Sequence, residues 1–230
     1  MKAPLMTLSL ALVLTACGGN DKPAPEAPKT SSSASTAAPV TATPAPATTP
    51  TPPSTTPDKA ALTDQAKNAV QKLGGTLKGE LETAMKTGGA IPALGICNLK
   101  APEIAKAVSA ESGMQVSRVS LKNRNPVMGQ ANDWQIQVLN DFEARKAKGE
   151  AVDTLAYSEI VEDEYRFMKA IPTGAVCLTC HGTEVKPEVL TKIKELYPND
   201  KAIGYQEGDI RGAFVAVKNL AATTTQNNAQ

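Results

Sequence analysis

Five consecutive residues, Cys177-Leu178-Thr179-Cys180-His181, constrain this chain more than any other segment. The pattern Cys-x-x-Cys-His is typical of covalent attachment of a c-type haem. Each thiol adds to one vinyl group of the porphyrin, and the histidine that follows binds the iron as the proximal ligand. The porphyrin fixes the distance between the two thioether bonds, so the spacing is specific. The motif therefore predicts one haem c, bonded to Cys177 and Cys180, with its iron bound by His181.

The N-terminus has the pattern of a bacterial lipoprotein signal. Lys2 gives a positive start, and the apolar run from Leu5 to Leu14 is too short to span a bilayer. The next residues reach Cys17 through a lipobox-like Leu-Thr-Ala, so we expect residues 1–17 to form the signal, with acyl chains on the Cys17 thiol. Gly18 then favours the outer membrane. This predicts a lipid-anchored protein of the cell envelope that faces the periplasm; an ordinary secretory signal is the alternative.

The cysteine and histidine counts limit the choice of iron ligands. The chain has 4 cysteines and 1 histidine. If lipid takes Cys17 and haem takes the motif pair, Cys97 has no disulfide partner, which needs an explanation in an oxidising compartment. Because His181 is the only histidine, a single chain cannot supply two histidine ligands. The sixth iron position must then be open or filled by water, methionine, lysine or a cysteine sulfur.

Composition divides the chain into segments. Residues 18–60 are rich in Pro, Ala, Thr and Ser without apolar periodicity, which is typical of an unfolded tether. Residues 221–230 have a similar character, so residues 61–220 remain as a single domain. The formal net charge is +1, and there is no basic run or nucleic-acid motif. We therefore expect no nucleic-acid partner.

Apolar spacing predicts helices and strands in the domain. Apolar residues recur at three- and four-residue steps from Leu62 to Leu81, which predicts a helix that Gly74-Gly75 weakens. Further helices are expected from Pro102 to Gly113, from Asn132 or Asp133 to Gly149, and from Pro187 to Pro198; strands are expected at 115–121, 155–161, 165–171 and 213–217, with a hairpin turn near Asp163-Glu164. The order of these elements predicts an α+β fold, with an antiparallel sheet and helices on one face.

Five segments that span almost the whole domain carry a resemblance to a known family: residues 96–102, 118–126, 170–173, 177–182 and 204–214. Together they resemble a family of c-type haem domains with a PAS-like fold, which form the extracytoplasmic sensor part of many bacterial kinases and chemoreceptors. The resemblance implies a PAS-like antiparallel sheet flanked by helices. It also implies thioether bonds at Cys177 and Cys180, His181 as the proximal ligand and Cys97 as the second axial ligand.

The same resemblance bears on partners. The sequence shows no transmembrane helix or kinase module of the kind that sensor members carry, so we expect a separate redox or signalling protein to read the state of the haem. PAS-like sensors often dimerise, which leaves a homodimer open. The lipid of the outer membrane is the other expected partner, through Cys17.

Each candidate residue has an alternative interpretation. Cys97 could be a buried small apolar residue, and a methionine could be the distal ligand instead. The three cysteines of the domain and His181 could hold zinc, although adjacent Cys180 and His181 make a poor chelate. Four cations are candidates for contact with the haem propionates, because guanidinium groups pair with carboxylates; the alternative is solvated surface charge. The methionines are Met85, Met114, Met128 and Met168, and the cations are Arg118, Lys122, Arg124 and Arg211.

The ligand chemistry favours a function. A thiolate opposite a neutral imidazole stabilises ferric iron and gives a low reduction potential, whereas methionine opposite histidine raises it. Such a site can change its coordination with redox state and open to CO or NO. We therefore expect a redox or gas sensor rather than an enzyme, with a low-potential electron carrier as the alternative. A haem peroxidase needs an open distal position with acid–base residues and is the weakest hypothesis.

Overall fold

A computed structural model of the protein describes residues 58–221. The predicted signal segment, the lipidation residue Cys17, almost all of the predicted tether and the predicted tail after Ala221 lie outside the described residues. Asp58 caps the first helix by accepting hydrogen bonds from the backbone N–H groups of Ala60 and Ala61. The first described helix therefore begins at Lys59.

A four-stranded antiparallel sheet forms the centre of the domain. The strand order is β1-β4-β3-β2, so the last strand of the chain lies between the first and the third. β2 and β3 form the expected hairpin, which turns at Glu162 with a positive φ of 54°. This confirms an α+β fold. The strands are β1 (Gln115–Val119), β2 (Ala156–Val161), β3 (Glu164–Pro172) and β4 (Ile210–Asn219).

The helices include all four that the apolar spacing predicts. Short additional helical segments, which the spacing does not predict, lie near the cysteines and after β1. Among residues 58–221, no helix is both long and apolar enough to cross a membrane. The helical segments are α1 (Lys59–Gly88), α2 (Ala90–Gly95), the π-helical turn η1 (Ile96–Lys100), α3 (Ala101–Ser112), α4 (Pro126–Gly129), α5 (Asp133–Ala147), the short turn η2 (Val152–Thr154), α6 (Ala175–His181) and α7 (Pro187–Leu196).

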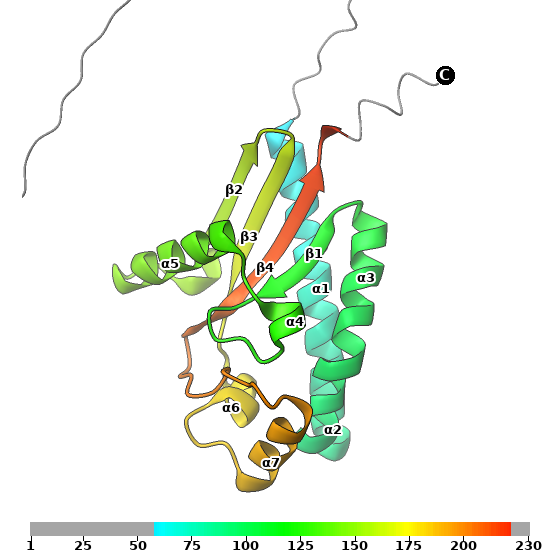
Figure 1. Ribbon diagram of the computed structural model, residues 1–230, viewed down its shortest axis with the longest axis vertical. Helices are drawn as coiled ribbons and strands as arrows, with labels where there is room; N and C mark the ends of the chain where they lie inside the picture. The colour runs from blue at the N-terminus through cyan, green and yellow to red at the C-terminus, as the bar shows by residue number, and fades with distance from the viewer. Residues whose placement is uncertain (1–57, 222–230) are drawn as a thin grey trace, which may run out of the picture. The chain divides into compact units, whose positions relative to one another are not determined.

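Helices cover both faces of the sheet, and the expectation that they lie on one face is wrong (Figure 1). Alternate side chains of a strand point to opposite faces. Tyr165 and Phe167 of β3 therefore pack against α1 and α3, whereas Met168 and Ala170 pack with α5. Because β3 is apolar on both sides, each face of the sheet needs a helical cover.

A third, smaller apolar cluster lies beyond one end of the sheet, where α2, α6 and α7 meet (Figure 1). Leu94 of α2 packs against Val189 and Ile193 of α7, and Cys180 of α6 is packed against the same group. This cluster holds the Cys-x-x-Cys-His segment close to α2, which leads through η1 into α3.

Local signals explain the boundaries of the long helices. Gly113 ends α3 in the left-handed conformation, and Asn132 and Gln135 form a capping box at the start of α5. The helix α1 continues through Gly74. The absence of a side chain at Gly74 lets the ring of Phe214 approach the helix. A Cβ at Gly74 would lie 2.8 Å from that ring. A side chain at this position would therefore force the Phe214 ring to shift.

Two glycine substitutions should change stability in opposite directions. Gly212 has a φ of +151°, and a Cβ there would lie 2.3 Å from the carbonyl oxygen of Val119. Gly212→Ala should therefore destabilise the fold by about 2–4 kcal/mol, through backbone strain and overpacking between β1 and β4. Gly75 is exposed in α1 with open space around it, so Gly75→Ala should stabilise by about 0.5–1 kcal/mol. Denaturant unfolding of both variants measures these changes; equal effects would contradict the assignment.

Asp209 ties α5 to the loop that leads into β4. Its carboxylate is 2.7 Å from the Lys146 ammonium and also accepts a hydrogen bond from the Gln206 N–H at 2.7 Å. Its backbone carbonyl accepts from the Thr173 N–H. The hydrogen bond from Lys146, followed by that from Gln206, lowers the pKa of Asp209. The loop before β4 is thus held at two points.

The lowered pKa of Asp209 makes a predictable contribution to acid sensitivity. The unfolded chain binds a proton at this carboxyl more readily than the folded chain, so the contribution is complete above about pH 4 and is lost as pH falls through the lower folded pKa. Asp209→Asn should therefore destabilise the protein at neutral pH, and the difference from wild type should vanish at the acid end. Unfolding free energies measured against pH test this, and a difference that grows with acid would contradict it.

Candidate haem site

The attachment motif lies on a short helix with a well-defined end. Cys177 and Cys180 are three residues apart on α6, so they share one side of the helix, and both are half-buried. The backbone carbonyls of His181 and Gly182 accept hydrogen bonds from the N–H groups of Tyr205 and Gly204, each at 2.9 Å. The segment before β4 thus anchors the histidine end of α6.

His181 has a fixed tautomer. Its Nδ1 lies 2.6 Å from the backbone oxygen of Ala202. Because a carbonyl oxygen only accepts, Nδ1 carries the proton, which leaves the lone pair on Nε2. Burial lowers the pKa of His181 well below its usual range, and the charges of Arg211 and Arg124 lower it further. The side chain is therefore a neutral imidazole, the form that binds a metal.

Arg211 contacts the free nitrogen of this imidazole. Its Nη2 lies 3.4 Å from His181 Nε2, and its Nη1 lies 3.4 Å from the hydroxyl of Ser120. The guanidinium carbon is 5.3 Å from the centre of the Tyr205 ring, which also meets the His181 ring edge-on at 6.3 Å. Within residues 58–221, Arg211 has no carboxylate partner. A metal could bind Nε2 only after Arg211 turns away from it.

Arg124 lies in a different environment from the other candidate cations. Arg124 and Asp200 form a buried ion pair, with Nε 3.1 Å from Oδ1 and side chains only 7% exposed. Its Nη2 also donates to the backbone carbonyls of Cys180, at 2.6 Å, and Ala202, at 3.3 Å. Nε and Nη2 of the guanidinium are therefore engaged within the protein, and these contacts favour a positioning role over the expected contact with a propionate.

Cys97 lies on the π-helical turn η1, between α2 and α3, and is half-buried. Burial raises the pKa of Cys180 and raises the pKa of Tyr197 to about 12. The nearby Cys97 thiol adds to the rise in both pKa values. Arg118 is also close enough to Cys97 and Tyr197 for their charges to act on it. Single π-turns inside helices occur frequently at functional sites. The structure thus brings Cys97 and the attachment motif into one neighbourhood.

The two remaining cations lie around the same group. Arg118 is exposed on β1, and its charge contributes to the low pKa of His181. It has no ion pair within the described part of the chain. Lys122 lies over the Tyr205 ring, with its Nζ 4.3 Å from the ring centre. Arg118 and Arg211 are therefore the two guanidinium groups near His181 that lack a carboxylate partner among residues 58–221.

The other candidate metal ligands occupy different places. Met114 and Met168 are buried in the cores on opposite faces of the sheet, Met128 is exposed on α4, and Met85 is half-buried in α1. Among residues 58–221, no three histidine, cysteine or acidic side chains are grouped so that they could hold a metal ion. The described residues thus offer no ready zinc cluster.

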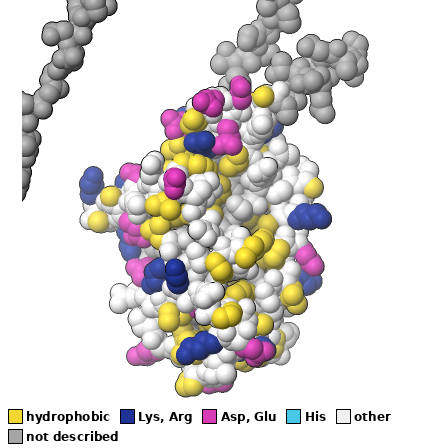
Figure 2. All heavy atoms as spheres, viewed as in Figure 1, with side chains coloured by type: hydrophobic (Ala, Val, Ile, Leu, Met, Phe, Trp, Pro, Cys, Tyr) yellow, Lys and Arg dark blue, Asp and Glu magenta, His cyan; other side chains and the backbone are white. Residues whose placement is uncertain are grey.

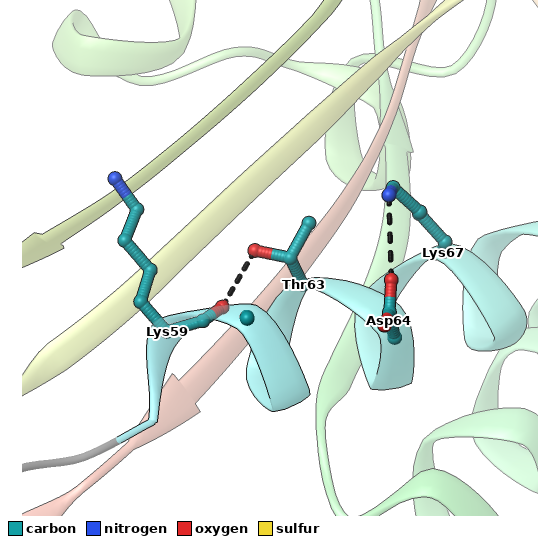
Figure 3. A pocket seen from close by; sticks show the side chains of 5 residues that line it. Lys59, Thr63, Asp64 and Lys67 are labelled. Atoms are coloured by element: carbon teal, nitrogen blue, oxygen red, sulfur yellow. Dashed lines mark hydrogen bonds and ion pairs between the residues drawn. The ribbon is translucent and has the colours of Figure 1, made fainter.

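Two surface hollows lie apart from His181 and Cys97. One, of about 350 Å³, is lined by side chains of a single exposed helical stretch at the start of α1, including Lys59, Thr63 and Lys67 (Figure 3). The other, of about 450 Å³, lies beside α4 and includes Leu121 and Ile136. Hydrophobic atoms are visible at the surface in this region (Figure 2). Neither hollow is lined by His181 or Cys97.

Several residues of the site are not predictable from motif spacing. Ala202 acts through its backbone oxygen, which leaves no mark on the side-chain sequence. Asp200 and Tyr197 follow α7 without any recognisable pattern. Tyr205 lies in one of the resembling segments, but nothing in its sequence context indicates the ring contacts with His181, Lys122 and Arg211.

The donor set fits a haem. Covalent attachment of a c-type haem uses two thiols three residues apart and a neutral imidazole, and cations can pair with its two carboxylates; the site has groups of all three kinds. The buried hydroxyl of Thr173, just before α6, has no hydrogen-bond partner within residues 58–221. It could therefore form a hydrogen bond with a polar group of a bound molecule. The residues that would hold the group are Cys177, Cys180, His181, Cys97, Arg118 and Arg211.

Comparisons with known proteins show the family of the chain. No curated protein matches the chain. Among solved structures, it matches the crystal structure of the cyanobacterial heme-protein Tll0287, with 25% identity and a TM-score of 0.56 over 71% of this chain and 97% of that chain. The sequence model of the Tll0287-like family matches residues 45–217, which is most of the chain. The chain therefore belongs to the Tll0287-like family.

Proposed function

We propose that this protein binds a single haem covalently through Cys177 and Cys180, with His181 and Cys97 as axial ligands, and acts as a redox or gas sensor of the bacterial envelope. The main support is the state of His181, whose proton is held on Nδ1 by Ala202 so that Nε2 keeps its lone pair. The similar cyanobacterial protein is a heme-protein, which agrees with the proposal. A PAS-like architecture for the sheet and its helices is part of it.

The cations have separate roles in this proposal. Arg211 must leave His181 Nε2 before iron binds there, and a propionate is the natural new partner for its charge. Arg118 is the second cation available for a propionate. Arg124 stays with Asp200. The haem itself would supply a one-electron couple and an iron position at which ligands exchange.

Cys97 favours sensing over simple electron transfer. Its thiol lies close enough to Arg118 for their charges to interact, and a thiolate is the form of cysteine that binds a metal. A thiolate ligand lowers the reduction potential and can be lost or protonated when the iron is reduced. Electron carriers work best with ligands that do not change. The location of Cys97 on a π-turn supports a functional role for this residue, because π-turns inside helices are frequent at functional sites.

The envelope location and the partners are further parts of the proposal. Acylation of Cys17 would anchor the protein in the outer membrane, and a separate redox or signalling protein would read the haem state. Membrane fractions of cells that express the full chain should retain wild-type protein, whereas Cys17→Ala should release it or leave its signal uncleaved. A wild-type protein free in the periplasm that begins at another residue would exclude lipidation.

Spectroscopy of the purified full chain tests the central proposal. The chain should keep one haem's mass after denaturation and acid–acetone extraction. Optical and EPR spectra should show low-spin ferric iron with thiolate ligation, and reduction should change the ligation and allow CO or NO to bind. If the spectra show ligands that stay the same in both redox states and no gas binding, the protein is an electron carrier. If no haem survives extraction, covalent attachment is excluded.

A further inference from the structure

The buried ion pair between Arg124 and Asp200 holds the residue that orients His181. Asp200 Oδ1 accepts a hydrogen bond from the N–H of Ala202 at 2.9 Å, and Arg124 Nη2 donates to the carbonyl of the same residue at 3.3 Å. Ala202 itself is completely buried. The two charged groups therefore hold Ala202 by both of its backbone polar groups.

The same guanidinium reaches the attachment helix. Arg124 Nη2 lies 2.6 Å from the carbonyl oxygen of Cys180, the residue before His181. A single side chain thus bonds both to the peptide that leads into His181 and to the carbonyl that accepts from its ring. These two points fix the backbone and the side-chain direction of the histidine.

The Arg124–Asp200 pair is buried and neutralised within the protein, whereas Arg118 and Arg211 have no carboxylate partner among residues 58–221. Both side chains are 7% exposed, and Asp200 meets Arg124 with both of its oxygens, at 3.1 and 3.3 Å. A buried ion pair is weak support for fold stability, because desolvation costs as much as the attraction gains. The three backbone contacts that the pair makes around His181 point to another role for it.

We infer that the Arg124–Asp200 pair is a positioning element that keeps the proton of His181 on Nδ1 and its Nε2 free for iron. The statement about iron rests on the proposed function, but the statement about the histidine proton does not. Without the pair, the His181 ring is the one remaining hydrogen-bond partner of the Ala202 carbonyl among residues 58–221, while the flanking residues Lys201 and Gly204 still bond to Asn123 and Gly182. The imidazole then loses the carbonyl that accepts its Nδ1 proton, and it takes up a mixture of tautomers. The tautomer that carries its proton on Nε2 cannot bind a metal through that nitrogen.

Nitrogen NMR on the full chain prepared without haem provides the first test. His181 is the only histidine, so ¹⁵N-labelled histidine gives the signals of one residue. At a pH where the ring is neutral, wild type should show a protonated Nδ1 and a bare Nε2. Asp200→Asn and Arg124→Lys, which break the paired geometry with little change in size, should shift the signals toward the Nε2–H tautomer. Unchanged signals in both variants would overturn the inference.

A double variant separates positioning from stability. Arg124→Met with Asp200→Leu leaves no buried charge, so its unfolding midpoint should recover relative to either single substitution. Its histidine signals should stay shifted, because neither new side chain holds Ala202. A purely structural pair would instead recover both properties together. The exposed pair Lys72–Glu111 offers a matched control: Lys72→Met with Glu111→Leu should leave the His181 signals as in wild type.

Haem loading gives an independent second readout. In cells that mature c-type haem, the fraction of Asp200→Asn chains with covalent haem and low-spin iron should fall about tenfold, as for other groups that orient a metal ligand. If wild type carries no haem, the proposed function fails, and the NMR result alone decides the inference. If wild type is loaded and the variants match it in both loading and tautomer, the inference fails and the proposed function stands.

Discussion

Replacement of both Cys177 and Cys180 by serine should leave the chain with no covalently bound haem. A serine hydroxyl is too weak a nucleophile to add to a vinyl group, so neither thioether bond can form. Each single substitution should keep at most one bond and lower the yield strongly. Mass spectrometry of the denatured chain measures this directly, since the mass of one haem is either present or absent.

The control for this pair is Cys97→Ser. It removes a thiol of the same site without touching the attachment helix α6, so it should retain the covalent haem. Covalent haem in the double serine variant would show that another residue forms the bond. Loss of haem in all three variants would instead point to misfolding, which the unfolding midpoint of each variant reveals.

Replacement of Cys97 by alanine should change the iron more than any other single substitution that leaves haem attached. Without the thiolate, ferric iron should convert from low-spin to a high-spin or water-ligated form. The loss of negative charge should raise the reduction potential, and ferrous iron should bind CO more readily. EPR, redox titration and CO difference spectra measure these three effects.

Met85→Leu is the matched control for the distal position. Met85 is the half-buried methionine of α1, and leucine keeps its size, so the spectra should stay as in wild type. A charge-transfer band from methionine to iron in wild type, or an EPR spectrum that Cys97→Ala leaves unchanged, would rule out the thiolate. The protein would then be better described as an electron carrier.

Much of the fold is predictable because its signals are local. Gly113 requires only its own backbone to end α3, and the capping box of α5 is complete within Asn132–Gln135. The alternation in β3 was also readable: Phe167 and Met168 are adjacent, apolar and on opposite faces, which already requires helices on both sides. By contrast, α6 has seven residues and no buried stripe, so its helical form depends on contacts with distant residues.

The candidate site is predictable only in part, for a related reason. Motif spacing identifies Cys177, Cys180 and His181, because the porphyrin imposes the spacing. It cannot separate Arg124 from Arg211: both are arginines in resembling segments, but one pairs with Asp200 while the other lies against His181. That difference arises from how the loop after α7 folds, and its main contacts pass through backbone carbonyls that no sequence pattern records.

The course of β4 sets the orientation of the site relative to the point where the chain enters the domain. The strand begins next to Arg211 and ends at Asn219, where Lys218 bonds to Gln65 in the first turns of α1. Its ten residues span roughly 30 Å. The first turn of α1, where the described part of the chain begins, thus lies at one end of the sheet, and α6 with His181 lies beyond the other end (Figure 1).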